Sequence, residues 1–398
     1  MIELKDKYKV RTDHARKRIA EVCNFQNSEP AVVIVDAPNW IFGELPNSYP
    51  GDYCGGNYEV MLQHQIKKIK QHDINDYDDC YEPFLMPWYG TCVLASAFGA
   101  EYTIHPFMDP AVNVSQVEDI SYVYELKQPD FMRDGLCPRV LDTITYFKEN
   151  CDLPIMMTDC QGPLTNALSL VGYENFMYWM YDEPEALHLL MQKITDALIA
   201  WMKLQKDTIG IAYTEPGYQM AVRTGDGKGG AVFSDDDAII LDPDFYQEFV
   251  KPYNQQVLMA FGGGCIHCCG DVTHQIENIK NTKGLTLYHN MTLDNLENAA
   301  KLQDGLREKN IAYVVGDFTL ADNRLDNYYG ELFRRLTPEG LIIASYIAPA
   351  VALNKGKYTE ANCDAVKVGK RVFEIIQKNI HIQIEPKRQD RYKIDHNK

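Results

Sequence analysis

The chain has 398 residues, of which 45% are hydrophobic, 11% aromatic and 24% charged, the proportions of a globular protein that is large enough for one barrel or several small domains. Its net charge of −17 excludes nucleic acid and membrane surfaces as expected partners, because phosphate backbones and anionic headgroups would be repelled. The N-terminus is charged where a signal peptide is apolar, and the 11 cysteines lack the spacing of a disulfide scaffold, so we expect a cytoplasmic protein with reduced thiols.

The first part of the chain predicts a helix, a strand and a loop. Residues 10–24 have helical periodicity, and residues 31–35 are an apolar, β-branched run that is typical of a strand. Residues 41–56 combine glycine, proline and aromatic side chains, which favours a packed loop or lid. We expect residues 1–80 to form an N-terminal helical extension that packs on the main domain.

From about residue 136 the sequence alternates between amphipathic helices and short apolar strands. Helices are predicted at 137–150, 182–201 and 243–260, and strands at 154–157, 264–269, 285–290, 311–317 and 341–347. Each strand ends in polar residues or glycine, and no nucleotide-binding glycine fingerprint is present. The pattern therefore predicts an α/β fold, with a single (β/α)₈ TIM-type barrel over residues 81–398.

The strand at 264–269 contains the most distinctive residues. Because side chains alternate along a strand, His267 and Cys269 share a face with Cys265, while Cys268 points to the other face. The Cα atoms of His267 and Cys269 are then about 6–7 Å apart, a span that one metal ion can bridge. Nitrogen and sulfur donors favour zinc over magnesium or calcium. The alternative is a buried thiol beside a hydrogen-bonded histidine.

Other polar residues also stand at predicted strand ends, where barrel enzymes place their active sites. They are expected to act as acid/base groups or to complete a metal site, although helix capping is an alternative for each: Asp159, Asp235, Asp236, Asp237, His289 and Asp317. A substrate pocket is expected to be lined by residues of the rim, for which simple packing is the alternative: Trp40, Trp88, Tyr89, Ser345 and Tyr346.

Several segments resemble the uroporphyrinogen decarboxylase superfamily. They are TDCQGPLTNA at 158–167, LDPDFYQEFVKPY at 241–253 and HCCGD at 267–271, and the likeness runs from about residue 80 to 375. The resemblance implies a (β/α)₈ barrel with its active site at the C-terminal ends of the strands. It also implies one of two activities, porphyrinogen decarboxylation without a cofactor or zinc-dependent methyl transfer with a corrinoid protein.

The motifs favour the methyltransferase branch. The decarboxylase branch binds its many substrate carboxylates with an arginine-rich RQAGRY motif, whereas the corresponding residues 36–43 here, DAPNWIFG, contain no cation. The methyltransferase branch has His-x-Cys-Gly after a strand, so His267 and Cys269 resemble its first two zinc ligands. The third ligand of the thiol-methylating members is a cysteine, and the aligned residue here is Ser345. Either a carboxylate or His289 completes the site, or the metal site is weaker or absent.

The resemblance thus implies a methyltransferase that uses Zn²⁺ and moves a methyl group between a small O-, N- or S-methyl compound and a corrinoid such as methylcobalamin. No corrinoid-binding Asp-x-His-x-x-Gly motif is present, so a separate corrinoid protein is the expected partner. Two alternatives remain. One is a cofactor-free decarboxylase or lyase that acts on a small carboxylic acid, with Asp159 or one of residues 235–237 as the acid/base group. The other is a binding protein that has lost the chemistry.

Overall fold

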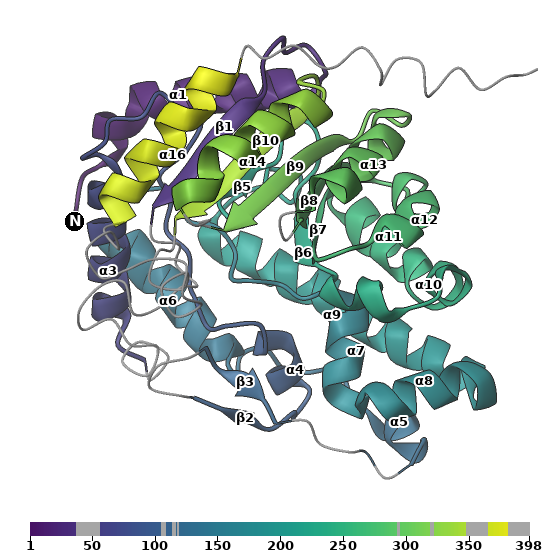
Figure 1. The fold of residues 1–398 in the computed structure, drawn as a ribbon. Coiled ribbons are helices and arrows are strands. Elements are labelled where there is room, and N and C mark those ends of the chain that lie inside the picture. The colour runs from purple at the N-terminus through teal and green to yellow at the C-terminus, as the bar shows by residue number, and fades with distance from the viewer. Residues whose placement is uncertain are drawn as a thin grey trace, which may run out of the picture.

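The chain forms a parallel sheet with helices packed on one face (Figure 1). The structure is a computed structural model and describes residues 1–36, 56–104, 109–113, 117, 119–292, 295–318, 322–347 and 365–380. Six parallel strands are hydrogen-bonded in the order β1-β10-β9-β8-β7-β6. Their bounds are β1 Ala31–Asp36, β6 Ala231–Ser234, β7 Gly264–Cys269, β8 Leu285–Met291, β9 Ala312–Phe318 and β10 Leu341–Ile347.

Helices connect the consecutive parallel strands from β6 to β10, as the alternating pattern predicts. Their bounds, with two short 3₁₀ turns, are η1 Asp236–Ile240, α10 Pro243–Phe249, α11 Lys251–Ala260, η2 Thr273–Gln275, α12 Ile276–Lys280, α13 Leu296–Arg307 and α14 Asp322–Arg335. The face of the sheet that these helices cover is called the outer face below, and the opposite face the inner face. Figure 1 shows α10 to α14 side by side along the outer face.

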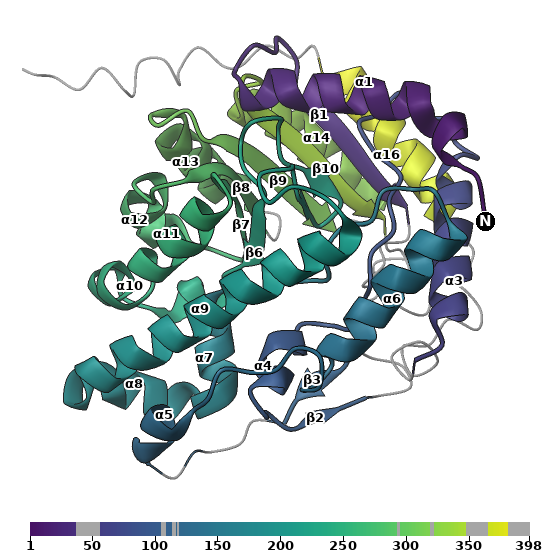
Figure 2. The ribbon, with the colours of Figure 1, turned by 180° about the vertical axis from the view of Figure 1, so that it is seen from behind.

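The first and last described helices cover the same edge of the sheet. Helix α1 (Lys5–Cys23) and helix α16 (Ala365–Asn379) both contact β1 and β10 (Figure 2). Strand β1 itself lies within the expected N-terminal extension and pairs in parallel with β10, from Ala31 opposite Ile342 onward. Residues 1–80 therefore supply a strand to the main sheet, and the expected division near residue 80 stays a prediction.

The remaining described elements lie between β1 and β6 in the chain. They are α3 Tyr58–His72, α4 Val93–Ala97, β2 Tyr102–Thr103, β3 Ala111–Val112, α5 Ser121–Glu125, α6 Cys137–Asn150, α7 Pro163–Val171, α8 Tyr173–Asp182, α9 Pro184–Ile209, β4 Tyr218–Gln219 and β5 Val222–Arg223. The short pairs β2–β3 and β4–β5 are antiparallel. Among the described residues, no helix is long and apolar enough to cross a membrane.

Two extended segments occupy the gap between the edge strands β1 and β6. The Cys80 amide donates to the Val32 carbonyl of β1 at 2.7 Å. Parallel bridges then join Leu85 to Ile155 and Gln161 to Ser234 of β6. The strand expected at 154–157 is thus reduced to one bridged residue. These contacts connect the two edges of the sheet, and the closed eight-stranded barrel stays a prediction.

The expected helices form, with one difference. The helix expected at 137–150 is α6, with the same bounds, and the one expected at 182–201 is α9, which runs on to Ile209 and ends at Gly210 in a left-handed conformation with φ of 92°. The helix expected at 243–260 is divided at Val250 into α10 and α11. Pro252 explains the division, because its missing N–H suits the first turn of a new helix but not the interior of a continuous one.

Candidate metal centre

Strand β7 places His267 and Cys269 on the inner face of the sheet, as the alternation of side chains predicts. His267 is 2% exposed, and its Nε2 atom lies 3.2 Å from the Cys269 Sγ atom. Cys268 is completely buried on the opposite face. The two adjacent cysteines therefore have different surroundings, and only Cys269 can bind the same metal ion as His267.

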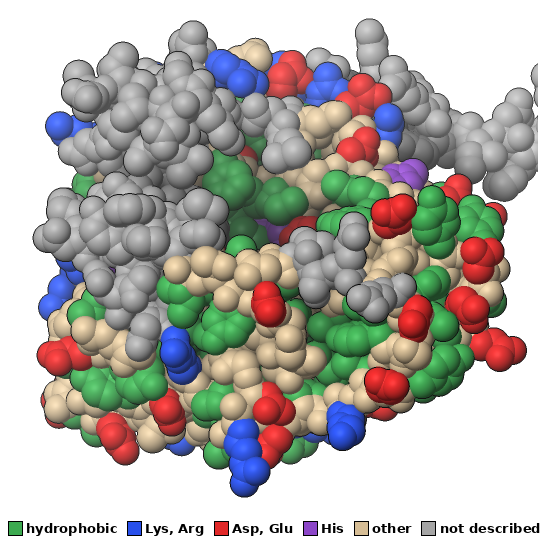
Figure 3. Space-filling model, turned by 90° about the horizontal axis from the view of Figure 1, so that it is seen from below, with side chains coloured by type: hydrophobic (Ala, Val, Ile, Leu, Met, Phe, Trp, Pro, Cys, Tyr) green, Lys and Arg blue, Asp and Glu red, His purple; other side chains and the backbone are tan. Residues whose placement is uncertain are grey.

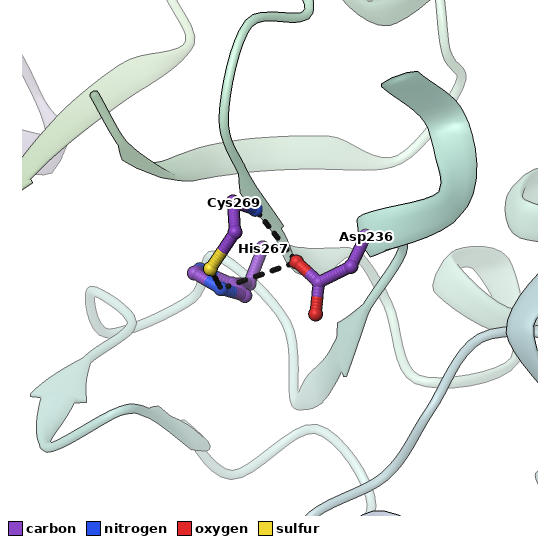
Figure 4. A group of neighbouring side chains, drawn as sticks. All are labelled: Asp236, His267 and Cys269. Carbon is purple, nitrogen blue, oxygen red and sulfur yellow. Dashed lines mark hydrogen bonds and ion pairs between the residues drawn. The ribbon is translucent and has the colours of Figure 1, made fainter. Parts of the chain in front are cut away.

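The third member of the group is Asp236, which begins η1 directly after β6 (Figure 4). Its Oδ1 atom accepts a hydrogen bond from the Cys269 amide at 2.6 Å and lies 3.5 Å from His267 Nε2. The backbone sets this position, because the Asp235 amide donates to the His267 carbonyl at 2.7 Å. The potential ligand atoms of Asp236, His267 and Cys269 all lie within 4.8 Å of one another.

This donor set fits a zinc ion. One carboxylate oxygen, one imidazole nitrogen and one sulfur provide three ligands, which is the usual number in a catalytic zinc site that keeps a fourth position for substrate. Burial and the nearby Asp236 carboxylate raise the pKa of the Cys269 thiol, and burial lowers the pKa of His267 against the opposing effect of Asp236. A cation at the centre of the group would favour the thiolate that zinc binds.

His289 does not join this group as a ligand. Its Nδ1 atom lies 2.9 Å from His267 Nδ1, on the side of that ring away from Cys269, and its Nε2 atom lies 3.2 Å from the Tyr346 hydroxyl. Burial, and secondly the neighbouring His267, lower the pKa of His289 well below its usual value. Of the two ways to complete the site that the sequence leaves open, the geometry favours a carboxylate.

Two predicted site residues face the helices. Ser345 and Asp317 are buried on the outer face, where the Ser345 hydroxyl donates to Asp317 at 3.0 Å and contacts the Tyr329 hydroxyl of α14 at 2.6 Å. Ser345, which aligns with the cysteine that is the third zinc ligand of the thiol-methylating members, is therefore turned away from His267. Neither residue is brought to the group of Asp236, His267 and Cys269.

The three consecutive aspartates after β6 have separate roles. Asp235 is buried and accepts hydrogen bonds from Tyr246 and Asn254, at 2.7 and 2.8 Å. Asp237 accepts from Thr165 and Tyr173, at 2.7 and 2.5 Å, and so joins η1 to the α7–α8 region. Asp236 alone turns toward the β7 pair.

A second carboxylate, Asp159, lies near this group. Burial raises the pKa of Asp159 to about 7, aided by the charges of Asp236 and Asp109, although the Gln161 amide donates to it at 2.6 Å. Asp109 was not predicted from the sequence, since it follows no recognisable strand. Burial raises its pKa to about 6, and the Trp88 indole donates to it at 2.7 Å.

The expected pocket residues are placed less uniformly. Trp88 is 6% exposed and binds Asp109, whereas the Tyr89 hydroxyl is buried against Thr143 at 2.7 Å, which is a packing role. Tyr346 is completely buried on the inner face. Trp40 lies outside the described residues. Figure 3 shows a hollow bordered by hydrophobic side chains, with histidine and acidic atoms visible inside it.

Comparisons with known proteins show that part of the chain is similar to uroporphyrinogen decarboxylases. The uroporphyrinogen decarboxylase (URO-D) family model matches residues 77–210, which include Asp159 but end before β6. Uroporphyrinogen decarboxylase from Syntrophotalea carbinolica is 29% identical over 168 residues, 40% of this chain and 42% of that protein. The enzyme of that name from Protochlamydia amoebophila is 25% identical over 104 residues, 25% of this chain and 26% of that protein. The matches thus span less than half of either relative.

The likeness in fold covers more of the chain. A methyltransferase from Methanosarcina mazei has a similar structure, with a TM-score of 0.65 and 17% sequence identity over 92% of this chain and 98% of that one. The group of Asp236, His267 and Cys269 lies outside the matched URO-D segment but inside this fold. Together these likenesses confirm the resemblance to the uroporphyrinogen decarboxylase superfamily that the sequence predicts.

Proposed function

We propose that the chain is a zinc-dependent methyltransferase that moves a methyl group between a small O-, N- or S-methyl compound and a corrinoid carried by a separate protein. The observation that carries this proposal is the convergence of Asp236, His267 and Cys269 at the C-terminal ends of β6 and β7. The likeness in fold to a methyltransferase supports it. We expect small methylated molecules and a corrinoid protein as partners.

The residues of this group would have different roles in such a site. Bound zinc would supply Lewis-acid chemistry to the heteroatom that carries or receives the methyl group. The charges of Asp236 and the Cys269 thiolate would together balance a divalent cation, while His267 binds as a neutral imidazole. Asp159, whose pKa is about 7, would hold a proton for the heteroatom when its methyl group leaves.

Metal analysis of the wild type beside His267→Ala is the first test. We expect about one zinc per chain in the wild type and none in the variant. The zinc-loaded protein is then mixed with free methylcobalamin or reduced cobalamin and with methylated or methoxylated compounds, and the visible spectrum of the corrinoid is followed. Methyl transfer that needs His267 supports the proposal, and a wild type that binds no zinc contradicts it.

A metal-free decarboxylase of the same fold is the second candidate. It is favoured by the matched segment, since both curated relatives are uroporphyrinogen decarboxylases and the segment contains Asp159. This candidate predicts release of CO₂ from a small carboxylic acid that persists in His267→Ala and in the presence of a chelator, but is lost in Asp159→Asn. The metal dependence of turnover therefore separates the two candidates.

A further inference from the structure

The inner face holds a chain of hydrogen bonds that the proposed methyl transfer does not itself use. We propose that His289 and Tyr346 are positioning residues, which fix the tautomer of His267 so that its Nε2 lone pair faces Asp236 and Cys269. The inference deepens the proposed metal site and rests on it for its function.

The first step is the proton of the Tyr346 hydroxyl. This hydroxyl lies 2.8 Å from the Met220 carbonyl oxygen, which belongs to the turn between β4 and β5. A carbonyl oxygen can only accept, so the hydroxyl proton points at Met220. The Tyr346 oxygen is then an acceptor toward His289 Nε2 at 3.2 Å. His289 therefore carries a proton on Nε2.

The second step passes from His289 to His267. A neutral imidazole has one N–H, and His289 is completely buried, which favours the neutral form. With its proton on Nε2, His289 accepts at Nδ1, so that His267 Nδ1 must donate across the 2.9 Å between the two rings. The unprotonated nitrogen of His267 is then Nε2, which lies 3.2 Å from the Cys269 sulfur and 3.5 Å from Asp236. One assignment of protons satisfies every contact in the chain of hydrogen bonds.

The backbone makes room for this chain of hydrogen bonds. Strand β9 lies between β8, which carries His289, and β10, which carries Tyr346. Gly316 of β9 faces the gap, and a Cβ atom there would stand 2.9 Å from His289 Nε2 and 2.3 Å from the Met291 sulfur. The missing side chain at Gly316 therefore allows two residues on non-adjacent strands to meet.

The turn that receives the last hydrogen bond is itself unusual. Met220 and Ala221 both have left-handed backbone conformations, with φ of 46° and 67°, which residues other than glycine and asparagine rarely adopt. Strained backbone tends to be kept where its position matters. Here the conformation sets the Met220 carbonyl that orients Tyr346.

The tautomer of His267 in the metal-free protein tests the inference directly. Protein labelled with ¹⁵N-histidine is studied by NMR, and the signals of His267 and His289 are assigned from single variants. We expect His267 with N–H at Nδ1 and a bare Nε2 in the wild type, and a mixture of tautomers in Tyr346→Phe. A wild-type His267 with its proton on Nε2 overturns the inference, even if the protein binds zinc.

Zinc affinity provides the second readout. Loss of a hydrogen-bond partner behind a metal-binding histidine weakens binding by about 10- to 100-fold. We expect this loss in His289→Ala and in Gly316→Ala, as measured by competition with a chromophoric chelator. His289→Asn should regain part of the affinity, because an amide oxygen can accept from His267 Nδ1.

Ser345→Ala serves as the matched control. Ser345 is the sequence neighbour of Tyr346 but lies on the outer face, so its loss should leave zinc affinity within about twofold of the wild type. Equal zinc affinity in the wild type and in a folded His289→Ala variant overturns the inference. A wild type with the expected tautomer but without zinc would contradict the proposed function and leave the positioning intact, so the two failures are distinguishable.

Discussion

The inner and outer faces of the sheet carry sequence neighbours of similar chemistry in different roles. Cys269 faces His267 and Asp236, whereas Cys268 is packed on the other side of β7. Tyr346 contacts His289, whereas Ser345 binds Asp317. On the inner face the potential ligand atoms of Asp236, His267 and Cys269 converge, whereas on the outer face Ser345 and Asp317 hydrogen-bond to each other. The direction of a side chain thus separates candidate ligands from structural polar residues.

The largest effect is expected from replacing each of the two cysteines in turn by alanine. Cys269→Ala should weaken zinc binding by at least about 100-fold, because a ligand is lost rather than a supporting contact. Cys268→Ala should keep one zinc per chain and lower the free energy of unfolding by about 1 kcal/mol, the cost of a small buried cavity. Elemental analysis and urea unfolding measure the two quantities. Equal loss of zinc in both variants would contradict the orientation of β7.

The two carboxylates offer the next comparison. Asp236→Ala should lower zinc affinity by about 100-fold, because a ligand is lost, and should affect stability little, because Asp236 is only partly buried. Asp317→Ala should leave zinc affinity unchanged and lower the free energy of unfolding by about 1–3 kcal/mol, because the hydroxyls of Tyr329 and Ser345 lose their acceptor. Chelator competition and thermal unfolding separate these outcomes. A larger zinc defect in Asp317→Ala would reverse the assignment.

Asp159 is expected to make stability depend on pH. Because its pKa in the folded protein is raised to about 7, the protonated carboxyl contributes stability that is full below pH 4 and is lost as the pH rises through 7. Asp159→Asn removes this dependence. The free energy of unfolding of the variant, relative to that of the wild type, should therefore rise by on the order of 1–2 kcal/mol from pH 5 to pH 8, allowing for the partial exposure of the side chain. Unfolding of the metal-free proteins in urea at both pH values tests this. If the free energies of unfolding of the variant and the wild type differ by the same amount at both pH values, the raised pKa of Asp159 is contradicted.

The smallest change is expected from restoring the family's cysteine. Ser345→Cys places a thiol on the outer face, where Asp317 and Tyr329 surround it. The cobalt-substituted variant should show the same thiolate-to-cobalt absorption as the wild type, because the new sulfur cannot reach the metal. A gain in that absorption would show that β10 turns its residue 345 toward the inner face.

Local patterns predict the elements of the site better than its assembly. The two-residue period of β7 correctly separates Cys269 from Cys268, and the helical periodicity at 137–150 gives α6 with its bounds. Strand ends also select residues near one edge of the sheet. They do not give the direction of each side chain, because register depends on pairing with neighbouring strands. Asp317 and Ser345 were therefore predicted for the site, although they face α14.

The chain of hydrogen bonds behind His267 was beyond sequence reasoning for a related reason. His289 stands at a strand end like a ligand, and only the 2.9 Å contact between Nδ1 atoms assigns it to support. The choice of Asp236 from three consecutive aspartates likewise depends on the turn after β6. The position of Asp109 beside Trp88 follows from tertiary packing alone.

In the proposed site one sulfur, one imidazole and one carboxylate hold the zinc, whereas the thiol-methylating members of the superfamily supply two sulfurs. X-ray absorption spectroscopy of the zinc-loaded wild type tests this set of ligands most directly. We expect one sulfur at about 2.3 Å and nitrogen or oxygen ligands at about 2.0–2.2 Å. Two sulfurs, or none, would contradict it.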